Sequence, residues 1–183
     1  MSRRVVVTGI GLVSSLGIGT KANWDALVSG TSGVGPITKF DASGYAAQIA
    51  AEVKGFDPLQ FVDKKDVKKM DVFIQYAIAA AQFAMDDSKL EITDEIAPDV
   101  GAFIGSGIGG IQTHAEQHSI LMNRGPGRIS PFLIPMMILN MASGVFSMYY
   151  KLRGPNVATC SACATSTHAL GEAWRTIKMG DAQ

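Results

Sequence analysis

Apolar and polar positions along the chain follow two alternating patterns. Short apolar runs rich in β-branched or small residues are typical of buried strands, and they occupy residues 4–8, 45–53, 100–105 and 156–162. Between these runs, apolar residues spaced three or four apart predict helices at residues 20–28, 71–85, 109–122, 135–149 and 164–179. Because strands alternate with helices, the predicted fold class is α/β with a parallel sheet.

Polar residues and glycine mark the ends of three of these helices. Thr20 and Asp71 stand where N-caps belong, and Gly180 follows the last apolar position of the final helix. The βα rhythm calls for another strand after Gly180, but the sequence stops at Gln183. The pattern therefore predicts an incomplete fold.

Composition places the chain among globular proteins. Of its 183 residues, 47% are hydrophobic and 17% are charged, which excludes a coiled coil or a disordered chain. Sixteen basic residues balance 16 acidic ones, so no overall field attracts nucleic acid or an anionic membrane. The N-terminal apolar run is shorter than a signal peptide requires, and two cysteines cannot form a disulfide framework. We therefore expect a cytoplasmic protein.

Residues 129–150 carry no charge and are long enough to cross a bilayer. They include Pro135, Asn140 and Ser143, whose polar and backbone groups lipid would leave unsatisfied. We therefore predict a buried helix and no membrane span. Its apolarity also suggests a contact between two copies of the chain.

Residues 105–110, GSGIGG, match the dinucleotide-binding pattern G-x-G-x-x-G between a predicted strand and a predicted helix. An acidic residue that holds the ribose should follow about 20 residues later. None occurs between Glu116 and Glu172. We therefore interpret the glycines as serving a turn of positive φ or a close backbone approach, and expect no nucleotide cofactor.

His114 and His118, together with Cys160 and Cys163, have the spacings of a zinc site. The two pairs lie far apart along the chain and in reversed order, and the apolar content suffices for folding without a metal. A redox dithiol needs both sulfurs near a helix N-terminus, whereas Cys160 falls inside a predicted strand. Neither a metal nor redox chemistry is predicted.

Cys163 stands where the predicted strand ends and the last helix begins, a position typical of a nucleophile elbow. Amides at a helix N-terminus favour the thiolate, and the small neighbours Ala162 and Ala164 leave room for a substrate carbonyl. The backbone N–H of Cys163 could bind the resulting oxyanion. The alternative is an inert buried cysteine.

Residues 154–171, GPNVATCSACATSTHALG, resemble the nucleophile motif of the β-ketoacyl-acyl-carrier-protein synthases, closest to the type II elongating enzymes. Residues 5–11, 105–110 and 129–132 are similar to that family in register. The resemblance implies that residues 1–183 form the N-terminal half of a layered thiolase-like fold, with a mixed sheet and a central buried helix after the nucleophile. It implies that Cys163 accepts the acyl chain and that Gly107, Ile108 and Phe132 line the acyl pocket.

In this family the resemblance implies acyl transfer followed by decarboxylative condensation with a malonyl thioester, without a cofactor. Two histidines, a lysine and a glycine-rich gate are supplied by a second, related half. His114, His118 and His168 lie outside those motifs, and His168, five residues past Cys163, should point elsewhere. The chain alone is expected to be inactive. The alternative is a non-catalytic fragment or an assembly or acyl-binding subunit.

A basic cluster is predicted to lie along one side of a short helix: Lys64, Lys65, Lys68 and Lys69. Asp63 and Asp66 dilute its charge, so a solvated surface is one interpretation. The resemblance favours a docking surface for acidic acyl carrier protein, with Arg124 and Arg128 as further candidates. It also favours a homodimer.

Overall fold

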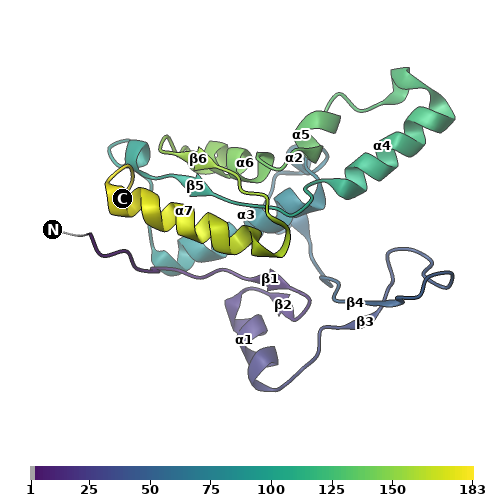
Figure 1. The fold of residues 1–183 in the computed structure, drawn as a ribbon, viewed down its shortest axis with the longest axis horizontal. Helices are drawn as coiled ribbons and strands as arrows, with labels where there is room; N and C mark the ends of the chain where they lie inside the picture. The colour runs from purple at the N-terminus through teal and green to yellow at the C-terminus, as the bar shows by residue number, and fades with distance from the viewer. Residues whose placement is uncertain (1–2) are drawn as a thin grey trace.

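The computed structural model describes residues 3–183, and Figure 1 shows the order of its elements. The helices are α1 (Thr20–Val28), α2 (Lys64–Val67), α3 (Val72–Ser88), α4 (Ile111–Arg124), α5 (Leu133–Met137), α6 (Met141–Tyr150) and α7 (Thr165–Met179). The strands are β1 (Val13–Ser14), β2 (Gly17–Ile18), β3 (Gly35–Pro36), β4 (Ile49–Ala50), β5 (Ala102–Phe103) and β6 (Asn156–Val157). Short 3-10 turns occupy Pro58–Gln60, Ala97–Asp99, Pro126–Arg128 and Ala162–Ala164.

The strands form three separate pairs. β1 pairs with β2 and β3 with β4, both antiparallel, whereas β5 and β6 are parallel with Ala102 opposite Asn156. The two parallel strands lie far apart in sequence and side by side in space, flanked by α6 and α7 (Figure 1). The predicted parallel pairing is therefore correct at β5 and β6, whereas the other two pairs are antiparallel, so the described strands do not form one parallel sheet.

The predicted strand at residues 4–8 is wrong. These residues are extended but pair with no other strand among residues 3–183, and Val6 and Val7 are exposed. A strand needs a partner to complete its hydrogen-bond ladder. The segment that follows is fixed differently: Gly9 and Gly11 lie against the backbone carbonyls of α3, where no Cβ would fit.

Helix ends agree with the sequence in two of three cases. The carboxylate of Asp71 accepts a hydrogen bond from the N–H of Phe73 at 3.2 Å and so caps α3. Gly180 closes α7 with φ 91°. The prediction for Thr20 is wrong, because Gly19 is the N-cap of α1 and the Thr20 hydroxyl donates to the carbonyl of Ile10 at 2.8 Å.

The predicted buried helix at 135–149 is two helices, α5 and α6, separated at Ile138. The carbonyl of Met137 accepts a hydrogen bond from the N–H of Gly110 at 3.0 Å, so it is used outside the helix where α5 ends. Only α6 has the predicted buried face, which includes Val145 and Phe146. Within residues 3–183, no helix combines the length and apolarity that crossing a bilayer requires.

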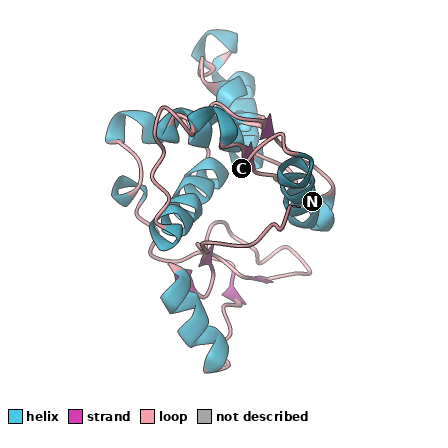
Figure 2. Cartoon of the chain, turned by 90° about the vertical axis from the view of Figure 1, so that its left-hand side faces the viewer, coloured by secondary structure: helices cyan, strands magenta, loops and turns pink. Residues whose placement is uncertain are grey.

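The core lies between α3 and α6, which make the most extensive helix contact. Figure 2 shows that helices and loops make up most of the chain and that the strands are short. Ile74 and Ile78 of α3 are fully buried and pack with Val145 and Phe146 of α6. Burying a side chain of this size contributes about 1.5–3 kcal/mol relative to leaving it in water. The strands β5 and β6, which lead to the glycine-rich loop and to the Cys163 turn, pack against α6 of this helix pair.

Helix α7, which the resemblance implies to be a central buried helix, packs through one face within this chain. Only Thr165 and Ala169 of its residues are buried, whereas Leu170 and Trp174 are 69% and 51% exposed. Packing on one side only leaves its other faces in solvent.

Candidate active site

Cys163 lies in the 3-10 turn Ala162–Ala164, directly before α7. It is an exposed free thiol, so the alternative of an inert buried cysteine is wrong for this chain. Ala162 has φ 51°, a left-handed conformation that costs a residue with a Cβ about 1 kcal/mol. The backbone thus makes a sharp junction before the helix, as the sequence predicts.

Two hydrogen bonds join the segment before Cys163 to Thr165, the first residue of α7, and a third closes the turn itself. The N–H of Ser161 donates to the hydroxyl of Thr165 at 2.8 Å, and the hydroxyl of Thr159 donates to the carbonyl of Thr165 at 3.1 Å. The N–H of Ala164 donates to the carbonyl of Ser161 at 3.1 Å. Because Thr165 is only 4% exposed, it anchors the turn to the interior.

The N-terminus of α7 has no side-chain cap. First-turn amides of a helix have no partner within it and favour negative charge beside them, although the N–H of Thr165 donates to the carbonyl of Ala162. Cys163 stands two residues before the helix begins. Cys163 therefore lies close in sequence to a helix N-terminus, a kind of position that favours negative charge.

The glycine-rich loop at residues 105–110 lies against this turn. The N–H of Ser106 donates to the carbonyl of Thr159 at 3.3 Å, and a Cβ at Gly105 would collide with Thr159 and Thr165. The carbonyl of Gly107 accepts a hydrogen bond from the thiol of Cys160 at 3.5 Å. The predicted close backbone approach is therefore confirmed. Cys160, predicted inside a strand, lies beyond β6 and is exposed.

The predicted acyl-pocket residues are only partly brought together. Gly107 and Ile108 belong to the loop beside the Cys163 turn, and Ile108 is 68% exposed. Phe132 precedes α5, and the ammonium of Lys69 lies 5.8 Å from the centroid of its ring. The glycine-rich loop contacts α5, the helix that Phe132 precedes, because the carbonyl of Met137 in α5 accepts a hydrogen bond from the N–H of Gly110.

The lysine cluster occupies α2 and the two residues that follow it. Lys69 donates to Asp66 at 2.8 Å, and this hydrogen bond lowers the pKa of the Asp66 carboxyl. Lys65 lies 3.7 Å from Asp63. Lys64 and Lys68 belong to the same short segment. Two of the four predicted docking lysines are therefore engaged with neighbouring carboxylates.

Arg124 and Arg128 do not lie beside the lysines. Arg124 is the last residue of α4, and Arg128 lies in the following 3-10 turn. That end of α4 projects away from α2 (Figure 1). In one copy of the chain, the six predicted basic residues therefore form two separate patches.

The hydrogen-bond partner of the His168 side chain is Ser161, two residues before Cys163. The Nδ1 of His168 lies 2.5 Å from the hydroxyl oxygen of Ser161. Side chains on a helix lean toward its N-terminus, so His168 covers the turn that precedes α7. Among residues 3–183, the structure gathers no three His, Cys, Asp or Glu side chains as metal ligands.

Asp71 does more than the sequence predicted. Besides capping α3, it accepts hydrogen bonds from the N–H of Thr113 at 3.0 Å and from the Thr113 hydroxyl at 2.6 Å. Asp71 and Thr113 are 5% and 4% exposed. One buried carboxylate thus fixes the start of α4, which directly follows the glycine-rich loop.

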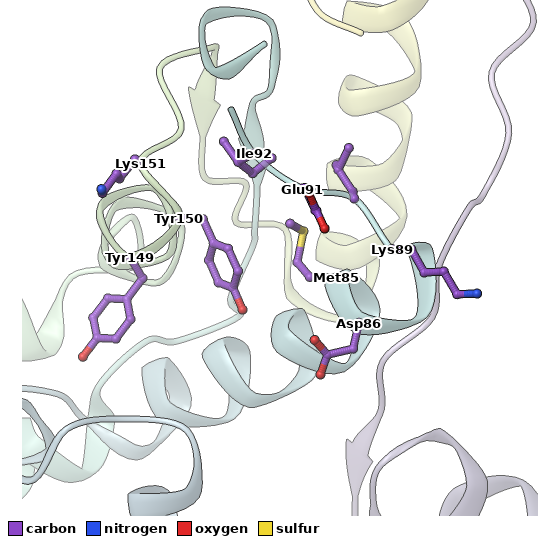
Figure 3. Close-up of a pocket in the computed structure, with 9 residues that line it drawn as sticks. Met85, Asp86, Lys89, Glu91, Ile92, Tyr149, Tyr150 and Lys151 are labelled. Carbon is purple, nitrogen blue, oxygen red and sulfur yellow. The ribbon is translucent and has the colours of Figure 1, made fainter. Parts of the chain in front are cut away.

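A separate open groove of about 740 Å³ lies between the C-terminal ends of α3 and α6 (Figure 3). Tyr150 points from α6 toward α3, and the ammonium groups of Lys89 and Lys151 point away from the middle of the groove (Figure 3). Burial, and then the charge of Asp86, raise the pKa of the Tyr150 phenol. The residues that line this groove do not include those of the Cys163 turn.

Comparison with known proteins identifies close relatives. The family profile described as Beta-ketoacyl synthase, N-terminal domain, matches residues 2–183. A protein of Coxiella burnetii named 3-oxoacyl-acyl-carrier-protein synthase 2 is 51% identical over 180 residues, which cover 98% of this chain and 44% of that protein. A protein of the same name from Vibrio harveyi is 49% identical over 181 residues, covering 99% of this chain and 44% of the relative.

Solved structures agree. A beta-ketoacyl synthase from Burkholderia phymatum, 26% identical, superimposes with a TM-score of 0.85 over 100% of this chain and 45% of the other. The predicted layered fold of ketosynthases, present as an N-terminal part, is therefore confirmed. The chain spans about 44% of the length of the curated relatives that it matches.

Proposed function

Since the chain belongs to the beta-ketoacyl synthase family by its N-terminal domain, we propose that it is the nucleophile-bearing part of a condensing enzyme of fatty acid synthesis. Residues 1–183 form one domain in this proposal, and Cys163 is its catalytic residue. The observation that carries the proposal is the exposed Cys163 thiol on a strained turn at an uncapped helix N-terminus.

In the first step, the Cys163 thiolate attacks the carbonyl carbon of an acyl thioester on acyl carrier protein. A sulfur–carbon bond forms, the carrier thiolate leaves, and the acyl chain remains on Cys163. Amides around the α7 N-terminus stabilise the tetrahedral oxyanion. Gly107, Ile108 and Phe132 contact the acyl chain in this proposal, and the position of the glycine-rich loop beside the turn supports the first two.

In the second step, malonyl-carrier protein loses carbon dioxide. The resulting enolate carbon attacks the acyl carbonyl, forms the new carbon–carbon bond and releases the Cys163 thiolate. The resemblance assigns decarboxylation to two histidines and a lysine of a second half. Acyl transfer to Cys163 is therefore the reaction to test with this chain.

The lysine cluster is the proposed docking surface for acidic acyl carrier protein, with Arg124 and Arg128 as a second patch. The contact between Lys69 and Phe132 supports it, because it places the cluster next to a proposed acyl-pocket residue. Replacing Lys65 and Lys69 by Glu should weaken carrier-protein binding, most strongly at low salt. Lys54→Glu, an exposed lysine outside the cluster, is the control. If the parent chain, the variant with both cluster lysines replaced and Lys54→Glu bind carrier protein with equal affinity, the lysine cluster is not the docking surface.

A homodimer is proposed as the working assembly. The exposed apolar residues Ile111, Met122 and Ile134 on α4 and α5 support a further contact surface there. A cytoplasmic location is proposed because two cysteines are too few for the disulfide framework of a small secreted protein. Light scattering at micromolar concentration tests the dimer.

Selective alkylation tests the nucleophile. The chain is treated near neutral pH with iodoacetamide or a cerulenin-like epoxide, and peptide mass spectrometry follows both cysteines over time. Cys163 should react several-fold faster than Cys160, although both thiols are exposed. Equal rates would contradict the proposal and favour the non-catalytic alternative, an assembly or acyl-binding subunit.

A further inference from the structure

We propose that His168 is a positioning residue for the candidate nucleophile: by its hydrogen bond to Ser161, it holds the turn that presents Cys163 to the helix N-terminus. The inference rests on the proposed function of Cys163. Its basis is the 2.5 Å contact between Ser161 Oγ and His168 Nδ1. Ser161 comes before the nucleophile and His168 comes after it, so the contact spans the nucleophile turn.

The turn needs such support because of its backbone. Ala162, between Ser161 and Cys163, has φ 51°, a conformation that its Cβ disfavours. A strained residue keeps its conformation only where surrounding contacts over-determine it. The hydroxyl of Thr165 accepts a hydrogen bond from the backbone N–H of Ser161, and the ring of His168 contacts the Ser161 side chain.

The position of His168 on α7 explains how it reaches the turn. Thr165 and Ala169 are the buried residues of the helix, so α7 packs through the face that carries them. His168 is adjacent to Ala169 and three residues after Thr165, at the border of that face. With its side chain leaning toward the N-terminus, the ring lies over Ser161.

The contact works in either protonation state of the ring. Neutral His168 with an unprotonated Nδ1 accepts the Ser161 hydroxyl proton, and a protonated ring donates from Nδ1 to the hydroxyl oxygen. Positioning therefore depends on a polar atom at the δ position rather than on the ring charge. An Asn side chain offers such an atom, whereas Leu does not.

Four variants of the chain test the inference by iodoacetamide alkylation across pH: Ser161→Ala, His168→Leu, the double variant of these two, and His168→Asn. Ser161→Ala, His168→Leu and the double variant should each slow Cys163 by about three- to tenfold, the effect of one lost hydrogen bond. Their effects should not multiply, since both residues act through one contact. His168→Asn should stay within about twofold of the parent chain. His114→Phe on α4 is the control, and the Cys160 rate reports any general loss of structure.

Several results would overturn the inference. They are an unchanged Cys163 rate in His168→Leu, effects that multiply in the double variant, or a His168→Asn chain as slow as His168→Leu, which would indicate a role for the ring charge. Should Cys163 be no faster than Cys160 in the parent chain, the proposed function fails instead. The contact is then read by ¹⁵N NMR of the imidazoles, where Ser161→Ala must move the Nδ1 resonance of His168 and leave that of His114 in place.

Discussion

Asp71 offers the sharpest test of how the site is supported, because its two carboxylate oxygens serve the N-termini of two helices. One accepts from Phe73 in the first turn of α3, and the other accepts from the backbone and the hydroxyl of Thr113 in the first turn of α4. The N–H of Thr113 has no partner within its own helix, as is general for first-turn amides. Replacing Asp71 by Ala therefore removes one cap and strands two buried donors.

The magnitude follows from these contacts. Losing the cap of α3 costs about 1 kcal/mol. Leaving the two buried donors of Thr113 unpaired costs about 1–3 kcal/mol each. We expect Asp71→Ala to lower the free energy of unfolding by about 3–7 kcal/mol, a large part of the roughly 5–15 kcal/mol that a domain of this size has in total.

Asp57 provides the matched control. It caps the 3-10 turn Pro58–Gln60 by accepting from the N–H of Leu59 at 3.0 Å, but it is exposed and serves one donor. Asp57→Ala should cost about 0.5–1 kcal/mol. Urea unfolding followed by circular dichroism measures both variants.

A second comparison protects the test against a chain that fails to fold. Thr113→Val removes the hydroxyl donor instead of stranding it, so it should cost only about 1 kcal/mol. Adding Asp71→Ala to Thr113→Val should then cost less than Asp71→Ala alone, which would show that the two sites are coupled. If Asp71→Ala and Asp57→Ala destabilise the chain equally, the double-capping role is refuted.

Three further outcomes follow from the structure. Gly105→Ala should destabilise the chain and slow alkylation of Cys163, whereas Gly127→Ala, with open space around its Cα, should change neither; urea unfolding and mass spectrometry check both. Gly144→Ala, also in open space within α6, should raise the free energy of unfolding by up to about 1 kcal/mol in the same urea assay. Folding raises the pKa of the Tyr150 phenol through burial and the charge of Asp86, so the protonated phenol contributes stability below the unfolded pKa of about 10, and this stability is lost as pH rises through the folded pKa. Tyr150→Phe should therefore reduce the fall in melting temperature above a pH of about 10. An unchanged fall would contradict the assignment.

Local signals predicted local structure well. The apolar spacing gave α1 the bounds Thr20–Val28 that the structure has, and Asp71 and Gly180 end their helices as expected. The small residues around Cys163 predicted the junction before α7. In each case the deciding contacts lie within a few residues of one another, so a sequence pattern can carry them.

Long-range partners were beyond the reach of the same reasoning. Residues 4–8 have the composition of a strand, yet pairing depends on a neighbour that no local pattern specifies. The bond between Asp71 and Thr113 joins residues 42 positions apart, and the break after Met137 depends on the N–H of Gly110. The contact of His168 was missed because the sequence reasoning compared it with Cys163 alone, whereas its partner, Ser161, lies before the helix begins.

The open side of α7 also carries an optical reporter. The indole of Trp174 is half exposed, and the ammonium of Lys178 lies 5.5 Å from the centroid of an indole ring of this residue, so its fluorescence reflects a wet, charged setting. Any molecule that binds to this face of α7 would exclude water from the indole ring and shift its emission to shorter wavelength. In a Trp24→Phe background, Trp174 becomes the sole indole of the chain, and titrations could then be followed without attaching a dye.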